Sequence, residues 1–243
     1  MSTFVLVPGF WLGAWAWNGV TETLRAGGHT VHPLTPTGLA DRVHLGGPQT
    51  DLGTHIDDIV NTIVYEDLGE VVLVGHSGAG GPVTGAADRI PERIRKIVYL
   101  DSGPLADGMS QLDLHPVEFR ESVKAALADG WRHEPPAWER QEELGASTAG
   151  LDQRDKERIA ARMTPQPYGT MTEPLRLGGA ADKTPKALIS CSFPLAQVRE
   201  LIEQGNPMFA GLAGPEWELH ELPTGHWPMF SRPGDTARLL GSL

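Results

Sequence analysis

Cysteine is almost absent from this 243-residue chain, which contains Cys191 and no other. An intrachain disulfide is therefore excluded, and so is a zinc site built from cysteines. The histidines do not show metal-binding spacings such as H-E-x-x-H, so we expect no metal. A chain without disulfides fits a reducing compartment, and we expect a cytoplasmic protein.

Positive charge is also scarce. Lys and Arg together number 20 against 31 Asp and Glu, which gives a formal net charge of −11. Non-specific binding to nucleic acid or to an anionic membrane requires a basic patch, and this chain has no run of like charges. We therefore expect neither a nucleic acid nor a membrane as a partner.

Long hydrophobic runs are missing as well. The apolar start of the chain is broken at Pro8-Gly9 and lacks the basic residues of a secretory signal. No segment approaches the ~20 apolar residues that cross a bilayer. These absences predict a soluble protein, and 243 residues are enough for one large domain with a sizeable core.

Short apolar runs alternate with segments of helical periodicity over much of the chain. Ile56, Ile59 and Ile63 share one face of a predicted helix, and Gly27-Gly28 would end a shorter one. Strands that alternate with such helices predict an α/β fold with a mostly parallel sheet. The runs that we interpret as strands are residues 4–7, 30–35, 71–75, 96–101, 187–191 and 216–222.

This alternation stops in the middle of the chain. Residues 114–130 and 151–163 have the pattern of helices, the second with Asp152 as its cap, and the stretches around them are too rich in proline for the interior of a sheet. A long surface excursion is one interpretation, but an ordered domain rarely carries so long a loop without a role. The predicted division is a core of residues 1–102 and 186–243, with a helical cap inserted at residues 103–185.

The stretch VVLVGHSGAG, residues 71–80, ends a predicted strand in a cluster of small residues. One interpretation is a phosphate-binding turn, since glycines follow a strand and Asp101 ends the next strand about 20 residues later, as in a dinucleotide site. However, Val83 occupies the place of the third glycine of G-x-G-x-x-G, and a Walker lysine and a Tyr-x-x-x-Lys pair are both missing. A dinucleotide-binding oxidoreductase is therefore a remote alternative, and no cofactor is expected.

The other interpretation places Ser77 on a sharp strand-to-helix turn, where a strained backbone requires small neighbours. These residues resemble the α/β-hydrolase superfamily, whose signature is G-x-S-x-G, with Ala79 in place of the last glycine. The stretches VPGFWLGAWAW and LPTGHWPMFSRP are similar to the branch that contains plant methylesterases, hydroxynitrile lyases and related bacterial esterases. The resemblance implies an α/β-hydrolase fold, with a mostly parallel central sheet flanked by helices and an inserted helical cap.

The same resemblance implies roles for particular residues. Ser77 falls at the position of the nucleophile, and His226, on the loop after the last predicted strand, falls at that of the general base. By position, the backbone N–H groups of Phe10 and Gly78 are the oxyanion donors. His76 occupies the variable position of the motif, and we interpret it as structural.

The acid of a catalytic triad is the difficult assignment. This branch normally carries an aspartate just after the strand predicted at 187–191, but here no carboxylate follows before Glu200. The end of the strand at 96–101 is the other place for the acid, and Asp101 lies there. Because neighbouring parallel strands end at the same edge of a sheet, we predict that Asp101 bonds the far nitrogen of His226. The alternative is that Asp101 only caps the following turn and a Ser-His dyad operates.

The predicted function is that of a serine hydrolase. The resemblance implies cleavage of a small hydrophobic carboxylic ester, a lactone or a thioester through an acyl-enzyme. Trp11, Trp131 and Trp138 are predicted to line an apolar substrate pocket, with packing in the core as the alternative for each.

Other functions stay open at this point. A hydroxynitrile lyase of this branch carries a lysine after the catalytic histidine and a threonine at the position of Phe10, whereas Trp227 follows His226 here. A non-catalytic, hydrolase-like protein that binds a small hydrophobic ligand is the alternative from a different class. The oligomeric state is open between a monomer and a homodimer.

Overall fold

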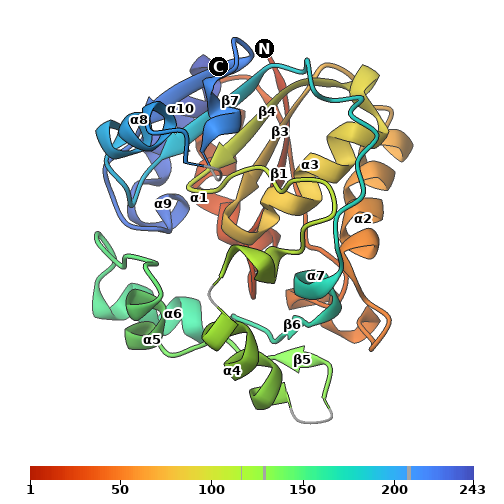
Figure 1. Ribbon diagram of the computed structural model, residues 1–243. Coiled ribbons are helices and arrows are strands. Elements are labelled where there is room, and N and C mark those ends of the chain that lie inside the picture. Colours follow the sequence, from red (N-terminus) through yellow and green to blue (C-terminus); the bar gives the residue numbers. More distant parts are fainter. Residues whose placement is uncertain (116, 128–129, 207–208) are drawn as a thin grey trace.

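A six-stranded sheet forms the centre of the protein, in a computed structural model that describes residues 1–243 except 116, 128–129 and 207–208 (Figure 1). The strand order is β2-β1-β3-β4-β7-β8, and every neighbouring pair is parallel. Each run that was predicted as a strand is confirmed. The strands are β1 (Thr3–Val7), β2 (Thr30–Pro33), β3 (Val71–His76), β4 (Ile94–Leu100), β7 (Lys186–Ser190) and β8 (Trp217–Glu221).

Helices cover both faces of this sheet (Figure 1). One face packs against α1 (Asn18–Ala26), α9 (Pro228–Ser231) and α10 (Pro233–Ser242). The other packs against α2 (Leu52–Tyr65), α3 (Gly80–Arg89) and α8 (Leu195–Glu203). Short 3₁₀ turns complete this layer and its connections: η1 (Ala14–Trp17), η2 (Ala40–Leu45), η3 (Ser77–Ala79), η4 (Pro91–Arg93), η5 (Gln111–Leu114) and η6 (Ala210–Ala213).

Strand β3 shows why the apolar runs are continuous. Val71 and Leu73 point into the core under α2 and α3, while Val72 and Val74 point into the core under α1 and α10. All four are fully buried. A parallel strand that is covered on both faces needs apolar residues at every position rather than at alternate ones.

The two helices predicted from periodicity are confirmed, and their ends follow from local chemistry. Asp51 caps α2, because its carboxylate accepts the backbone N–H of Thr54 at 2.8 Å. Helix α1 ends at Gly27, and Gly28 adopts a φ of 83°, which glycine reaches at little steric cost.

The helices and short strands between β4 and β7 gather at the carboxyl ends of the sheet strands, at the end of the molecule opposite the two chain termini (Figure 1). Residues 173–185 then run back to the start of β7. The helix predicted at 114–130 is present as α4, although positions 116 and 128–129 lie outside the described residues. The second predicted helix is α6, and Asp152 caps it by accepting the N–H of Asp155 at 2.7 Å. The elements are α4 (Val117–Leu127), β5 (Arg132–His133), α5 (Trp138–Glu143), α6 (Gln153–Ala160), β6 (Gln166–Pro167) and α7 (Gly169–Thr172).

A short antiparallel ladder joins β5 to β6, which the sequence did not predict. Each strand has two residues, and Pro167 lies in the ladder. Pairs this short carry no alternating pattern, and proline is tolerated because the ladder has no interior strand.

The exact division into core and cap stays a prediction. No helix among the described residues has the length and apolar character to cross a membrane.

Candidate active site

Ser77 stands at the junction of β3 and α3 with a φ of 52°, in the left-handed region that non-glycine residues rarely adopt. Small neighbours permit this turn. A methyl group on Gly75 would lie 2.7 Å from the Val83 side chain, and one on Gly80 would collide with the Gly103 carbonyl. Ala79, by contrast, is buried within the apolar core, so its methyl group is accommodated where the signature has glycine. The strained turn presents the Ser77 side chain beyond the carboxyl end of β3.

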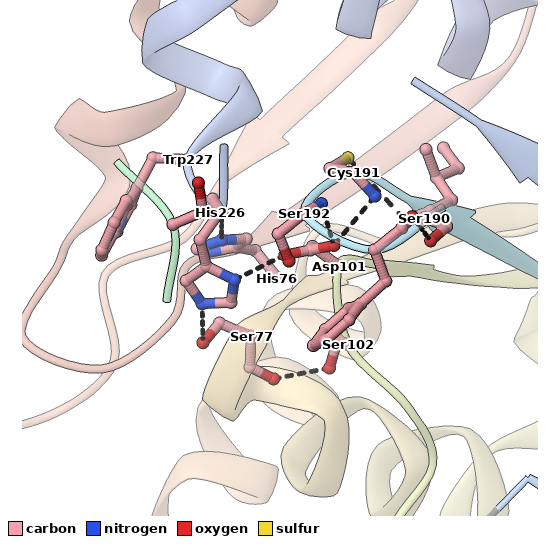
Figure 2. A network of polar contacts seen from close by, with 12 residues as sticks. His76, Ser77, Asp101, Ser102, Ser190, Cys191, Ser192, His226 and Trp227 are labelled. Atoms are coloured by element: carbon pink, nitrogen blue, oxygen red, sulfur yellow. Dashed lines mark hydrogen bonds and ion pairs between the residues drawn. The ribbon is translucent and has the colours of Figure 1, made fainter. Parts of the chain in front are cut away.

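His226 follows β8, and its Nε2 lies 2.7 Å from the Ser77 Oγ (Figure 2). Its backbone is held from two sides. The N–H donates to the carbonyl of Ser147 at 2.7 Å, and the carbonyl accepts a hydrogen bond of 2.7 Å from the Nε2 of His76. The ring of Trp227 stands edge-on to the His226 ring, with centroids 5.0 Å apart. The imidazole is therefore fixed in position as well as in reach of the serine.

Asp101 lies just after β4, and its Oδ2 is 2.6 Å from the Nδ1 of His226 (Figure 2). The loop after β7, which lacks a carboxylate, supplies three donors to Asp101 instead. The N–H groups of Cys191 and Ser192 donate to Oδ1 at 2.9 Å each, and the Ser192 hydroxyl donates to Oδ2 at 2.6 Å. The structure thus brings Ser77, His226 and Asp101 into one chain of hydrogen bonds.

The protonation states of this chain follow from its surroundings. Burial raises the pKa of Asp101, but the hydrogen bonds from His226 and Ser192 outweigh burial and lower that pKa to about 2. Asp101 is therefore ionised at neutral pH and can only accept hydrogen bonds. It follows that Nδ1 of a neutral His226 carries the proton, and that Nε2 is free to accept the Ser77 hydroxyl.

His76 is more than a variable motif residue, because it supports the His226 backbone. Its ring is completely buried and lies 5.0 Å from the His226 ring, centroid to centroid. Burial and the neighbouring His226 lower the pKa of His76 to about 3. His76 is therefore neutral at pH 7, with its proton on the Nε2 that donates to the His226 carbonyl.

Phe10 and Gly78 lie together next to Ser77. A methyl group on Gly78 would meet the Phe10 ring at 2.7 Å, so the ring lies directly against this glycine. Both residues line a small cavity that encloses about 10 Å³, which is room for about one water molecule. Three buried polar residues also line it: His55, Gln166 and Thr170.

The three tryptophans do not line this cavity as far as the described residues define it. Trp11 follows Phe10, and its indole N–H donates to the His133 carbonyl at 3.1 Å. Trp131 packs on Gly46 and lies 4.2 Å from the Arg132 guanidinium, ring centroid to carbon. Trp138 stands edge-on to Trp227. A role for them in substrate binding stays a prediction.

Sequence reasoning missed Ser192 and Gln166. Ser192 is the second residue after β7, close to where this branch would place its acid, and a polar residue there was the available signal. Gln166 lies in a proline-rich stretch, and nothing local marked it. Within the part of the chain that the structure describes, no cluster of three or more His, Cys, Asp or Glu side chains could hold a metal ion.

Comparison with known proteins agrees with this architecture. A family model described as the alpha/beta hydrolase family matches residues 4–239. The chain therefore belongs to the alpha/beta hydrolase family, as its sequence predicted. It is also 32% identical to a carbendazim-hydrolyzing esterase of Nocardioides sp. (strain SG-4G), over 249 aligned residues that cover 100% of both proteins.

Solved structures share the fold at lower identity. An extracellular alpha/beta hydrolase from a Paenibacillus species is 22% identical, with 100% of this chain and 98% of that chain covered and a TM-score of 0.82. A methylesterase from Arabidopsis is 21% identical, with 99% and 97% covered and a TM-score of 0.72. A pyrethroid hydrolase from Sphingobium faniae JZ-2 is 20% identical, with 99% and 96% covered and a TM-score of 0.71.

Proposed function

We propose that this protein is a serine hydrolase that cleaves small hydrophobic carboxylic esters, or related lactones or thioesters, through an acyl-enzyme. The observation that carries the proposal is the chain of hydrogen bonds from Ser77 through His226 to Asp101, with distances of 2.7 and 2.6 Å. A serine hydroxyl is a weak nucleophile unless a base accepts its proton, and this arrangement supplies an oriented base.

In the first half of the reaction, Ser77 Oγ attacks the ester carbonyl carbon while His226 Nε2 takes the hydroxyl proton. The ionised Asp101 stabilises the resulting imidazolium. The backbone N–H groups of Phe10 and Gly78 donate to the oxyanion of the tetrahedral intermediate. When the intermediate collapses, His226 gives its proton to the departing alkoxide, and an alcohol leaves.

In the second half, water attacks the acyl-enzyme. His226 accepts one proton from this water, the hydroxide oxygen bonds to the acyl carbon, and the same proton returns to Ser77 Oγ as the acid leaves. The free enzyme is restored. Each oxyanion donor contributes about 10²–10³ in turnover in enzymes of this kind.

The relatives support an ester as the substrate class. The curated relative is named an esterase, and one solved neighbour is a methylesterase.

A dinucleotide role has less support, because the Phe10 ring and the Gly103 carbonyl fill the space beside Gly78 and Gly80 that a pyrophosphate would need. A lyase role lacks its lysine, since the buried Trp227 follows His226. We also propose a cytoplasmic location, on the cysteine content alone.

The test is hydrolysis of p-nitrophenyl acetate, followed by a panel of small methyl and ethyl esters. We expect steady turnover by the wild type and loss of turnover in Ser77→Ala, with unchanged folding by circular dichroism. Turnover that persists in Ser77→Ala would contradict the proposal. A wild type that binds hydrophobic ligands without turnover would favour the non-catalytic alternative.

A further inference from the structure

The backbone at Trp11, one residue past Phe10, is held in an unusual conformation. Trp11 has a φ of 64°, in the left-handed region, which is unfavourable for a bulky residue. Such a conformation persists where surrounding contacts over-determine it. At Trp11 these contacts come from the segment inserted between β4 and β7.

Three polar groups of Trp11 bond to that segment. Its N–H donates to the Gln166 Oε1 at 3.0 Å, and its carbonyl accepts the N–H of Thr164 at 3.0 Å. Its indole N–H donates to the His133 carbonyl at 3.1 Å. The first bond fixes the peptide plane that joins Phe10 to Trp11, and the second fixes the plane after Trp11. The chain that directly follows the Phe10 N–H is therefore held in place, which restricts the orientations open to that N–H.

Gln166 is itself held rigidly. Its side chain amide donates to the Thr170 Oγ1 at 2.7 Å, and the Thr170 hydroxyl donates to the Pro167 carbonyl at 2.6 Å. Gln166 is 1% exposed, so turning its amide would leave buried polar groups without hydrogen-bond partners, which is unfavourable. Because the Trp11 N–H can only donate, the amide oxygen must face it. Gln166 is therefore a fixed acceptor.

We propose that Gln166 is a positioning residue that holds the Phe10 backbone N–H in the direction of the oxyanion, so that the inserted segment completes the oxyanion hole. This inference rests on the proposed hydrolase function. Gln166 and Thr170 line the same small cavity as Phe10 and Gly78, which places the amide beside the site. Gln166 acts through Trp11 and does not touch the reacting atoms.

The test is Gln166→Met, which keeps the volume of the side chain and removes the acceptor. We expect kcat on p-nitrophenyl acetate to fall by about 10–100-fold, as oxyanion donors lose their alignment. KM should change by less than about threefold, because the ground state makes less use of the hole. The inhibition constant of a trifluoromethyl ketone, whose serine adduct carries an oxyanion, should rise by the same factor as kcat falls.

Gln141→Met is the matched control. Gln141 is also a buried glutamine of the inserted segment, at 4% exposed. Its amide donates to the Pro136 carbonyl at 2.8 Å, within the same segment, and so does not bond to Phe10 or Trp11 in this way. It should retain the wild-type kcat and ketone affinity. If both glutamine variants lose kcat and ketone affinity equally, the effect is one of general packing and the inference is overturned.

Other outcomes are equally decisive. Wild-type kcat and ketone affinity in Gln166→Met, or a change in KM alone, would overturn the inference while the hydrolase function stands. If Gln166→Met does not fold, Thr170→Val decides, because it removes the hydroxyl that holds the amide and should shift kcat and ketone affinity in the same direction, by less. An unchanged Thr170→Val would then overturn the inference. A wild type that neither hydrolyses esters nor binds the ketone would overturn the proposed function and this inference with it.

Discussion

The carboxylate beside His226 belongs to Asp101, at the end of β4, and Ser192, on the loop after β7, bonds to it. The loop after β7 lacks a carboxylate, yet its backbone and the Ser192 hydroxyl hold the Asp101 carboxylate against His226. The carboxylate lies just after β4, and the loop after β7 supplies hydrogen-bond donors to it. The charge beside the imidazole is therefore supplied from one strand and held in place from the next.

The first prediction concerns this carboxylate. In Asp101→Asn, the amide group can donate to His226 and so favours the tautomer that cannot accept the Ser77 proton. We expect kcat to fall by about 10⁴, as when a triad acid is neutralised in a serine protease. The measurement is turnover of p-nitrophenyl acetate, with the thermal unfolding midpoint as a check on folding.

Ser192→Ala is the control for this prediction. It removes one hydroxyl donor but leaves the charge of Asp101 and both backbone donors in place, so turnover should fall by about tenfold at most. An Asp101→Asn variant that kept more than about a tenth of the wild-type turnover would favour the Ser-His dyad over a triad.

The resemblance to the hydrolase superfamily predicted the positions of Ser77 and His226, and the end of an apolar strand predicted that of Asp101. The sequence did not predict Ser192, Gln166 or the part that His76 plays. These residues act through contacts between segments distant in the chain, and a polar residue in a loop carries no local sign of such a contact.

The strand–turn–helix element around Ser77 depends on glycine at particular positions. Gly80 begins α3, where a side chain would run into the backbone carbonyl of Gly103. Gly103 lies close to Asp101, so the close approach also ties the nucleophile turn to the end of β4. The Ser102 hydroxyl adds a hydrogen bond of 2.5 Å to the Ser77 carbonyl (Figure 2).

Gly80→Ala should therefore destabilise the protein. The methyl group must displace a backbone carbonyl, and we expect a loss of about 1–3 kcal/mol in the free energy of unfolding. Gly103→Ala is the control, because its methyl group would meet nothing within 4 Å, and its effect should stay within about 0.5 kcal/mol. Equal urea midpoints for the two variants would contradict the claim that a side chain at position 80 must displace the Gly103 carbonyl.

Among the secondary-structure elements, the sequence predicted the strands and helices of the sheet layer well and those of the inserted segment less well. The strands of the sheet are continuous apolar runs, and α2 has a clear helical stripe, so local pattern and tertiary burial agree. The β5–β6 ladder has two residues in each strand, which is too short for any periodicity to show.

The inserted segment forms hydrogen bonds to two loops beside Ser77, the loop that carries His226 and the loop that carries Trp11. Residues Ser147 and Ala149 accept the backbone N–H groups of His226 and Gly225, at 2.7 and 2.9 Å. Thr164 and Gln166 bond to the backbone of Trp11, next to Phe10. The inserted segment therefore holds both the loop that carries His226 and the loop that carries Phe10.

Global stability should carry the signature of the buried neutral His76. Its pKa is lowered from the usual 6.5 to about 3, so between these values the unfolded chain binds about one more proton at this residue than the folded one. The free energy of unfolding should thus decrease as pH falls through this window. His76→Gln, which retains an N–H donor, should reduce this slope by on the order of 1 kcal/mol per pH unit. Urea unfolding between pH 4 and pH 6 measures it, and identical slopes in both proteins would contradict the neutral assignment.

We propose that His226 activates Ser77, and reaction with a serine-directed fluorophosphonate followed by intact-mass measurement tests this activation. We predict one adduct on the wild type and none on Ser77→Ala, with slower labelling of His226→Ala because its serine keeps the proton. An unlabelled wild type, or equal labelling of wild type and Ser77→Ala, would contradict the claim.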